Sequence, residues 1–293
     1  MADPKAGAQI RLHLASDYTG EAAALTFLSN FPEAIAVQHR AIAILTDALS
    51  FALSALSLVL IRVREAAPNA REGQSPHLWR EISEGLQVVL RHPVLRALAG
   101  GSGLFNFFDS FLYSVYVLYL TRTLDMPPVF VGIVFALGGA GGLLGALLCG
   151  RVTRAVGLGP TLLGGALLAA VAELVIALAG GSLLAALLMV IVGEASVQAG
   201  AAFYGINGLS LRQAIVPDRL QGRVNATVRV ISLGVVPLGA LLGGTIGDRY
   251  GLRPTVLIAG VGTLLAFLLV FVSPVRRLRS QPAEADSAVT EIN

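Results

Sequence analysis

Three acidic residues interrupt long apolar stretches of this sequence: Asp109, Glu173 and Glu194. A charged side chain at the centre of a bilayer costs about 2.5–3.5 kcal/mol on insertion scales, so such a residue usually faces a cavity or a partner. Intramembrane carboxyl groups commonly belong to pathways for protons or ions. The alternative is that each carboxyl only fixes the packing of two helices through a hydrogen bond. The sequence leaves both interpretations open.

Two of these acids belong to polar stripes with the spacing of a helix. Residues three or four apart lie on the same helix face. Two polar faces at mid-membrane depth would suit a pathway for protons and a small-molecule substrate. The candidate residues are Asn106, Asp109, Tyr113 and Tyr116 on the first stripe, and Glu194 and Gln198 on the second.

Composition places these groups in a membrane. The 293 residues are 55% hydrophobic and only 13% charged, whereas soluble domains are about a quarter charged. Hydrocarbon offers the backbone no hydrogen-bond partners, so stretches of about 20 apolar residues predict transmembrane helices and an all-α membrane protein. Seven stretches qualify: 41–61, 98–121, 129–150, 160–180, 183–207, 229–247 and 254–273.

The arginines predict the orientation of these spans. They gather in alternate connections and in the tail, and the positive-inside rule places that side in the cytoplasm. The segment 206–230, with four arginines, is expected to be a cytoplasmic loop. The expected order in a multi-pass protein of the cell (inner) membrane is a non-spanning segment 1–40, a span 41–61, a cytoplasmic loop 62–97, a six-helix bundle 98–273 and a cytoplasmic tail 274–293.

The loop 62–97 is expected to contain an amphipathic helix. Ser75 followed by Pro76 is typical of a helix start, because a capping residue precedes proline at the first helical position. Such a helix lies on the inner membrane face or packs against neighbouring loops, and the sequence does not choose between them. Its apolar positions are Leu78, Ile82, Leu86 and Val89.

The sequence contains an internal similarity. Both 143–163 and 241–257 read Leu-Leu-Gly, then Arg, then Gly-Leu-x-Pro-Thr-x-Leu, with Pro160 and Pro254 94 residues apart. The arginine distribution places the two connections on opposite sides, which predicts an inverted repeat of three helices. The alternative is a chance similarity between glycine-rich turns. The expected repeats are 98–180 and 183–273.

Glycines four residues apart occur on two of the spans. They are Gly138 and Gly142 on one, and Gly239 and Gly243 on the other. Small residues at this spacing let helix backbones approach closely. We therefore expect these positions to serve helix packing rather than chemistry.

Several segments, in order, resemble the major facilitator superfamily, in particular its enterobactin-exporter-like and macrolide-efflux-like permeases. The similarity covers about 41–280. It implies a fold of twelve helices in two six-helix halves, with alternating access driven by a proton gradient. The matching segments are "TDALSFALSAL" (46–56), "LWREISEGLQVVLRHPVLRAL" (78–98), "NGLSLRQAIVPDRLQGRVN" (207–225) and "GDRYGLRPT" (247–255).

The resemblance implies that the chain corresponds to helices six to twelve of that fold. The first and fourth helices of each half would line the cavity, and these are the helices that carry Asp109 and Glu194. Residues 145–157 resemble a loop motif in which arginines and an acid form a cytoplasmic charge latch, but Thr153 stands where the acid is expected. The loop residues implied are Gly150, Arg151, Arg154 and Gly157, together with Arg212, Arg219 and Arg223 in the next cytoplasmic connection.

The same resemblance leaves five helices without a counterpart, and residues 1–40 cannot supply them. Alternating access is a rocking of one half against the other. The sequence therefore predicts either an N-terminally truncated transporter or a chain that needs a second chain to supply the missing half.

The leading hypothesis is a secondary active transporter that exports small amphipathic solutes or drugs by proton antiport. An inactive fragment of such a permease is the alternative, and a seven-helix receptor is a further one. Retinal binding is excluded because the only lysine, Lys5, lies outside the spans. No enzyme motif is present, and the arginines lie between apolar segments rather than in a patch for nucleic acid. The four histidines lie outside the spans, so no metal or cofactor is expected.

Overall fold

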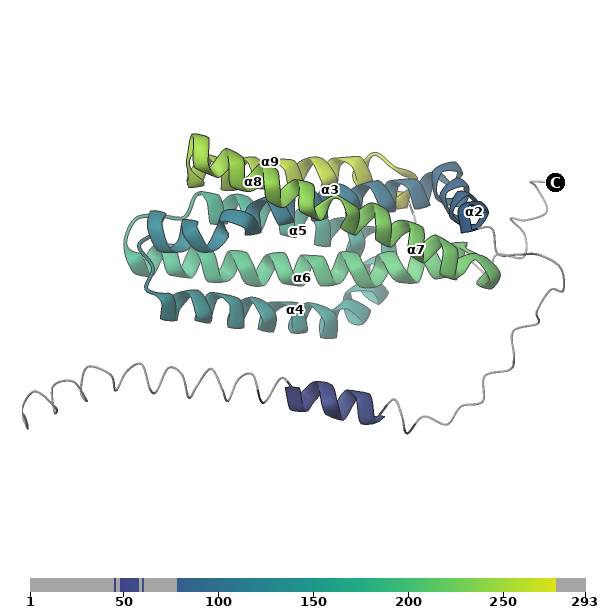
Figure 1. Ribbon diagram of the computed structural model, residues 1–293, viewed down its shortest axis with the longest axis horizontal. Helices are drawn as coiled ribbons and strands as arrows, with labels where there is room; N and C mark the ends of the chain where they lie inside the picture. The colour runs from purple at the N-terminus through teal and green to yellow at the C-terminus, as the bar shows by residue number, and fades with distance from the viewer. Residues whose placement is uncertain (1–44, 46–47, 58–59, 61–77, 278–293) are drawn as a thin grey trace, which may run out of the picture. The chain divides into compact units, whose positions relative to one another are not determined.

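The computed structural model describes residues 45, 48–57, 60 and 78–277, which are coloured in Figure 1. The chain divides into two units, Met1–Gly73 and Gln74–Asn293. The expected segment 1–40 and most of the tail lie outside the described residues. In the first unit a short apolar helix, Ala48–Ser57, is described, so the span expected at 41–61 is described only in part.

The second unit is a bundle of long helices (Figure 1). A π-helical turn, Tyr119–Thr123, extends α3, and a 3-10 turn, Pro274–Arg277, follows the last helix. Residues 78–277 contain no strand. The helices are α2 (Leu78–Arg91), α3 (Pro93–Leu118), α4 (Pro128–Val156), α5 (Leu158–Ala177), α6 (Leu183–Ile215), α7 (Asp218–Gly234), α8 (Val236–Tyr250) and α9 (Leu252–Phe271).

Six helices in the described residues are long and apolar enough to cross a membrane, with α7 and α8 counted as one. The chain is therefore an all-α membrane protein, as predicted. Large apolar side chains remain exposed on the outer faces of α4 and α8, which suits contact with lipid. They include Leu143, Leu144, Leu147, Leu241 and Leu242.

The prediction that 206–230 forms a loop is wrong, because most of this segment is helical. α6 begins where Ser182 caps the amide of Ala185 and continues to Ile215 instead of ending at 207. Leu, Arg, Gln and Ala in this stretch are good helix formers, and the first helix-breaking residue is Pro217, which also disfavours helical geometry at Val216. α7 then begins at once, so the segment is helical on both sides of a two-residue turn.

The span expected at 229–247 is also too short. α7 and α8 together form one membrane span, Asp218–Tyr250. The helix of this span is interrupted at Val235. Pro237 follows this position and has no N–H to continue the helical ladder, which accounts for the interruption. Similarly, α3 begins at Pro93 rather than at 98, because proline is favoured in the first helical turn.

The two halves of the bundle are built alike, as the inverted repeat predicts. Gly157 between α4 and α5 has φ 98° and ψ 163°, and Gly251 between α8 and α9 has φ 95° and ψ 162°. This left-handed region favours glycine. Thr161 and Thr255, four residues later, each donate from Oγ1 to the carbonyl of that glycine at 2.7 Å. Successive spans alternate in direction, so the two turns lie at opposite ends of the bundle.

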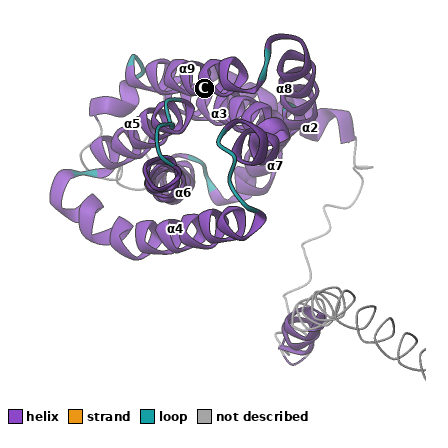
Figure 2. Cartoon of the chain, turned by 90° about the vertical axis from the view of Figure 1, so that its left-hand side faces the viewer, coloured by secondary structure: helices purple, strands orange, loops and turns teal. Residues whose placement is uncertain are grey.

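Helix packing follows the same symmetry. α4 packs on α6 as α8 packs on α3, and α5 packs on α6 as α9 packs on α3. α5 and α9 pack on each other across the repeat. Seen along the helices, α4 lies at one edge of the bundle and α8 at another (Figure 2). The helices that carry the two polar stripes are therefore packed across the repeat, α3 on helices of the second half and α6 mainly on helices of the first.

α2 packs against helices α7 and α3 rather than against loops. Val89 is buried in a cluster with Val224 and Val228 of α7, whereas Leu86 from the expected stripe is 38% exposed. The contact runs through Gly85, where an added Cβ would lie 2.9 Å from the carbonyl oxygen of Arg223. The side chains of Leu78 and Ile82, and the expected start at Ser75, lie outside the described residues.

Candidate functional site

The polar stripes of α3 and α6 meet at one hydrogen-bonded group, which we call the Glu194 cluster: Tyr113, Glu194 and Gln198. The Tyr113 hydroxyl donates to Oε1 of Glu194 at 2.5 Å. Nε2 of Gln198 donates to the same oxygen at 3.0 Å and to the Tyr113 hydroxyl at 3.1 Å. Glu194 is only 2% exposed. A buried carboxyl group is therefore held by donors from two different helices.

Small residues of α4 make room for this cluster. A Cβ at Gly138 would lie 2.6 Å from Cγ of Glu194, closer than side-chain carbons approach. A Cβ at Gly142 would reach Cβ of Gln198 at 3.4 Å, an ordinary contact. The glycine predicted for packing at position 138 thus lies directly against the acid.

The remaining members of the α3 stripe lie near the cluster without joining its hydrogen bonds. The ring of Tyr116 packs edge-on against Tyr113 at 5.4 Å between centroids, and its buried hydroxyl has no hydrogen-bond partner in the described part of the chain. Asp109 is partly buried. Asn106 donates from Nδ2 to the carbonyl of Ser102 on its own helix at 2.8 Å.

Glu173 lies between α5 and α9, outside the Glu194 cluster. It is 1% exposed, and its Oε2 accepts from Oγ1 of Thr263 at 2.7 Å. Its other carboxyl oxygen has no hydrogen-bond partner among the described residues. The local arrangement is a single hydrogen bond between two closely packed helices.

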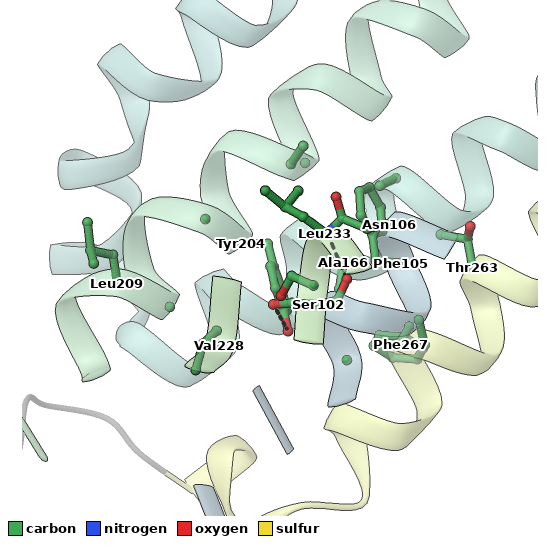
Figure 3. A pocket seen from close by; sticks show the side chains of 18 of the residues that line it. Ser102, Phe105, Asn106, Ala166, Tyr204, Leu209, Val228, Leu233, Thr263 and Phe267 are labelled. Atoms are coloured by element: carbon green, nitrogen blue, oxygen red, sulfur yellow. Dashed lines mark hydrogen bonds between the residues drawn. The ribbon is translucent and has the colours of Figure 1, made fainter. Parts of the chain in front are cut away.

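A cavity of about 460 Å³ is lined by residues of α3, α5, α6, α7 and α9 (Figure 3). Asn106 is the one predicted pathway residue among its lining. Tyr204 is fixed in its wall, donating to the carbonyl of Leu98 at 3.1 Å and accepting from Ser102 at 3.4 Å. The other polar lining residues are Arg212, Asn225, Arg229, Ser232 and Thr263.

Sequence reasoning missed most of this cavity. One signal was present, because Ser102 lies four residues before Asn106 and extends the α3 stripe by one turn. Arg212 and Arg229 were assigned to a loop, although both lie on helices and line the cavity. Thr263, on α9, has no polar stripe around it, and only the fold brings it into the lining.

The predicted charge latch has a different counterpart here. Gly150, Arg151 and Arg154 lie on the last turns of α4 rather than in a loop, and both arginines are exposed. Thr153, at the position of the expected acid, donates to Oδ1 of Asn207 on α6 at 3.0 Å. An uncharged hydrogen bond therefore joins α4 to α6 at this end of the bundle.

The two arginines of α7 that the resemblance implied as loop residues differ in their contacts. Arg219 is exposed, whereas Arg223 forms an ion pair with Glu84 of α2.

The glycines predicted for packing on α8, Gly239 and Gly243, lie against the carbonyl oxygens of Phe107 and Phe111 on α3. A side chain at either glycine would collide with backbone, so these two positions set the distance between α8 and α3.

Comparison with known proteins identifies the family. The family model described as Major Facilitator Superfamily matches residues 40–232 and 99–292. The chain belongs to the major facilitator superfamily. The resemblance seen in the sequence is therefore confirmed, and the match covers the Glu194 cluster and the helices around the cavity.

Two curated relatives show similarity over much of this superfamily chain. The multidrug efflux pump Tap of Mycolicibacterium fortuitum is 29% identical over 234 residues, covering 78% of this chain and 55% of the relative. An uncharacterized MFS-type transporter, y4rN of Sinorhizobium fredii, is 27% identical over 199 residues, covering 67% and 48%. The chain spans about half the length of the curated relatives it matches.

Proposed function

We propose that this chain belongs to a secondary active transporter that exports small amphipathic solutes in exchange for protons. The observation that carries the proposal is the Glu194 cluster, a buried carboxyl group held between α3 and α6. Intramembrane acids of this kind are typical of proton relays. The name of one relative, a multidrug efflux pump, supports export of drug-like solutes.

Glu194 is proposed as the proton-carrying group. As a carboxylate it needs donors in its buried position, and Tyr113 and Gln198 supply them. A proton on the carboxyl group removes that need and weakens the hold of Glu194 on Tyr113 of α3. The two protonation states would therefore favour two arrangements of α3 and α6, which is the coupling that exchange requires. Asp109 and Asn106 would extend the polar path along α3 toward the cavity.

We also propose that the chain lies in the cell membrane with its arginine-rich end and its C-terminus in the cytoplasm. α3 and α7 begin at this end, α4 and α6 finish there, and Arg151, Arg154 and Arg219 are exposed on it. The positive-inside rule supports this orientation. A second six-helix unit would complete the path, because rocking needs two halves, and in vesicles that hold only this polypeptide a second copy of the chain would supply it.

The test is flux through proteoliposomes that hold only this polypeptide. Vesicles would be loaded with anionic, uncharged or cationic fluorescent amphiphiles, and a pH gradient would be imposed with and without a protonophore. We expect gradient-dependent flux of at least one amphiphile, abolished by the protonophore and by Glu194→Gln. Absence of gradient-dependent flux for all of them would contradict the proposal for this polypeptide and favour an inactive fragment.

A further inference from the structure

The charge of the cavity lining is one-sided. Arg212 and Arg229 contribute to it, and among the described residues no aspartate or glutamate does. In the described part of the chain neither arginine forms an ion pair with an acid. Nε of Arg212 is buried and has no hydrogen-bond acceptor there. A buried guanidinium N–H without an acceptor is costly, so this side chain is placed to receive an acceptor from outside the described chain.

The rest of the lining is mainly apolar. Phe105, Ala166, Ala266 and Phe267 line the cavity from α3, α5 and α9, whereas the arginines come from α6 and α7. The hydroxyl of Tyr204 is already engaged with α3. The volume of about 460 Å³ lies in the range of small-molecule sites. A polar part of a ligand would therefore contact arginine, and an apolar part would contact aromatic and aliphatic side chains.

The cavity opens between α6 and α7. Leu209 and Leu233 both line it and are 41% and 48% exposed, and the two helices make little contact beyond their shared turn. Arg229, also exposed, lies one turn along α7 from Asn225, which lines the cavity with Arg212. An apolar rim on membrane-spanning helices gives an amphiphile access from the bilayer.

We propose that this cavity binds an amphipathic anion. Its carboxylate, sulfonate or phosphate would accept hydrogen bonds from Arg212 and Arg229, whose planar guanidinium groups suit such anions. Its apolar part would lie against Phe105 and Phe267. This inference rests on the proposed function and deepens it, because it names the class of substrate that enters the transport path.

The test measures binding by the purified polypeptide in nanodiscs of phosphatidylcholine, without any pH gradient. The probe is a dansyl-labelled fatty acid, and its methyl ester is the uncharged match. We expect Arg212→Gln with Arg229→Gln to weaken fatty-acid binding at least about tenfold, the effect of losing charge-assisted hydrogen bonds. Arg91→Gln with Arg96→Gln is the control, since it removes equal charge from exposed positions at the same end. The ester should bind more weakly and equally to all three proteins.

A steric pair tests the location. An added Cβ at Gly205 meets nothing within 4 Å although this residue lines the cavity, so Gly205→Phe should fold and fill the site. Gly164→Phe, at an exposed position of α5 with equal free space, is the control. Equal loss of binding in both arginine pairs, equal affinity for acid and ester, or full binding to Gly205→Phe would each overturn the proposal.

A further arm identifies the source of the anion. Part of the phosphatidylcholine is replaced by phosphatidylglycerol. A weaker fatty-acid affinity in the unmodified protein, absent from the Arg212→Gln/Arg229→Gln variant, would show that an anionic lipid headgroup occupies the site. An unchanged affinity would assign the site to a free amphiphile.

The two proposals fail in distinguishable ways. Retained arginine-dependent binding without gradient-driven flux would contradict only the transport function. Gradient-driven flux of an uncharged or cationic dye, together with equal binding of acid and ester, would contradict only the anion site.

Discussion

Glu194 and Glu173 are buried to nearly the same degree, 2% and 1% exposed, but their surroundings differ. One oxygen of Glu194 accepts from two donors, on α3 and α6. Glu173 has one donor, Thr263, and its second oxygen has no hydrogen-bond partner among the described residues. Burial alone therefore does not distinguish the two acids. The two acids differ in the helices that they join. They also differ in the number of hydrogen-bond donors that can respond when the carboxyl group gains or loses a proton.

Both acids bridge the two halves of the inverted repeat. Glu194 of α6 contacts α3, and Glu173 of α5 contacts α9. Beside Glu173 the helices are tightly packed, since a Cβ at Gly260 of α9 would lie 2.8 Å from the side chain of Leu174. Such a contact favours a fixed joint. Both contacts reach the cavity wall, the Glu194 contact through Asn106 of the α3 stripe and the Glu173 contact through Thr263. They differ in that α5 and α9 pack on each other, whereas α3 and α6 share few backbone contacts.

The largest expected effect separates the two acids directly. Glu194→Gln keeps the size and hydrogen-bonding capacity of the side chain but cannot carry a proton. We expect proton-coupled flux to fall at least about 100-fold, the usual cost of losing a proton-transferring group. Glu173→Gln should leave the flux within about twofold. Equal losses in the two variants, measured in the same proteoliposomes, would remove the distinction.

The next effect compares two tyrosines of the same stripe. Tyr113→Phe removes a hydrogen bond to Glu194, and a bond to a charged group contributes about 1.5–3 kcal/mol, so we expect coupled flux to fall about tenfold. The hydroxyl of Tyr116 has no partner in the described chain, and Tyr116→Phe should change flux little. Flux assays would measure the two losses, and thermal unfolding would check that both variants remain folded. A larger loss of flux in Tyr116→Phe than in Tyr113→Phe would refute the prediction.

A smaller effect is expected at α4. Gly138→Ala places a methyl group against Glu194, whereas an added Cβ at the neighbouring Gly139 meets nothing within 4 Å. We expect Gly138→Ala to lower flux a few-fold by displacing the acid. Gly139→Ala should be neutral or stabilise the helix by up to about 1 kcal/mol. Similar flux in the two variants would show that the position of Glu194 does not depend on α4.

The last effect concerns stability at Glu173. Thr263→Val removes the one donor that the described residues give this buried carboxyl group, and it should lower the free energy of unfolding by about 1–3 kcal/mol. Combining it with Glu173→Leu removes both polar partners and should recover part of the loss. Denaturant titration of the two proteins provides the measurement. A double variant less stable than Thr263→Val would contradict a purely structural role for the pair.

Hydropathy predicted the bundle because long apolar stretches have few alternatives in a membrane. It failed where helices are polar. α6 continues through Arg212, and α7 begins before its apolar part, because arginine and glutamine favour helices as well as aliphatic residues do. A hydropathy boundary is therefore the edge of the apolar segment and not the end of the helix.

The sequence predicted which residues of each helix belong to the candidate site, but it did not predict how the helices bring them together. Helical spacing placed Glu194 with Gln198 and placed Tyr113 on the α3 stripe, but spacing cannot show that two stripes face each other. The resemblance to a known family implied that both helices line a cavity. The cavity itself required the fold, since Arg212, Arg229 and Thr263 come from three helices with no shared pattern.

The central claim is that Glu194, and not Glu173, carries the proton that is exchanged. Infrared difference spectra of the reconstituted polypeptide between acidic and alkaline buffer report protonated carboxyl groups directly. We predict a carboxyl band that disappears at alkaline pH, is absent from Glu194→Gln and persists in Glu173→Gln. A spectrum of Glu194→Gln identical to that of the unmodified protein would contradict the claim.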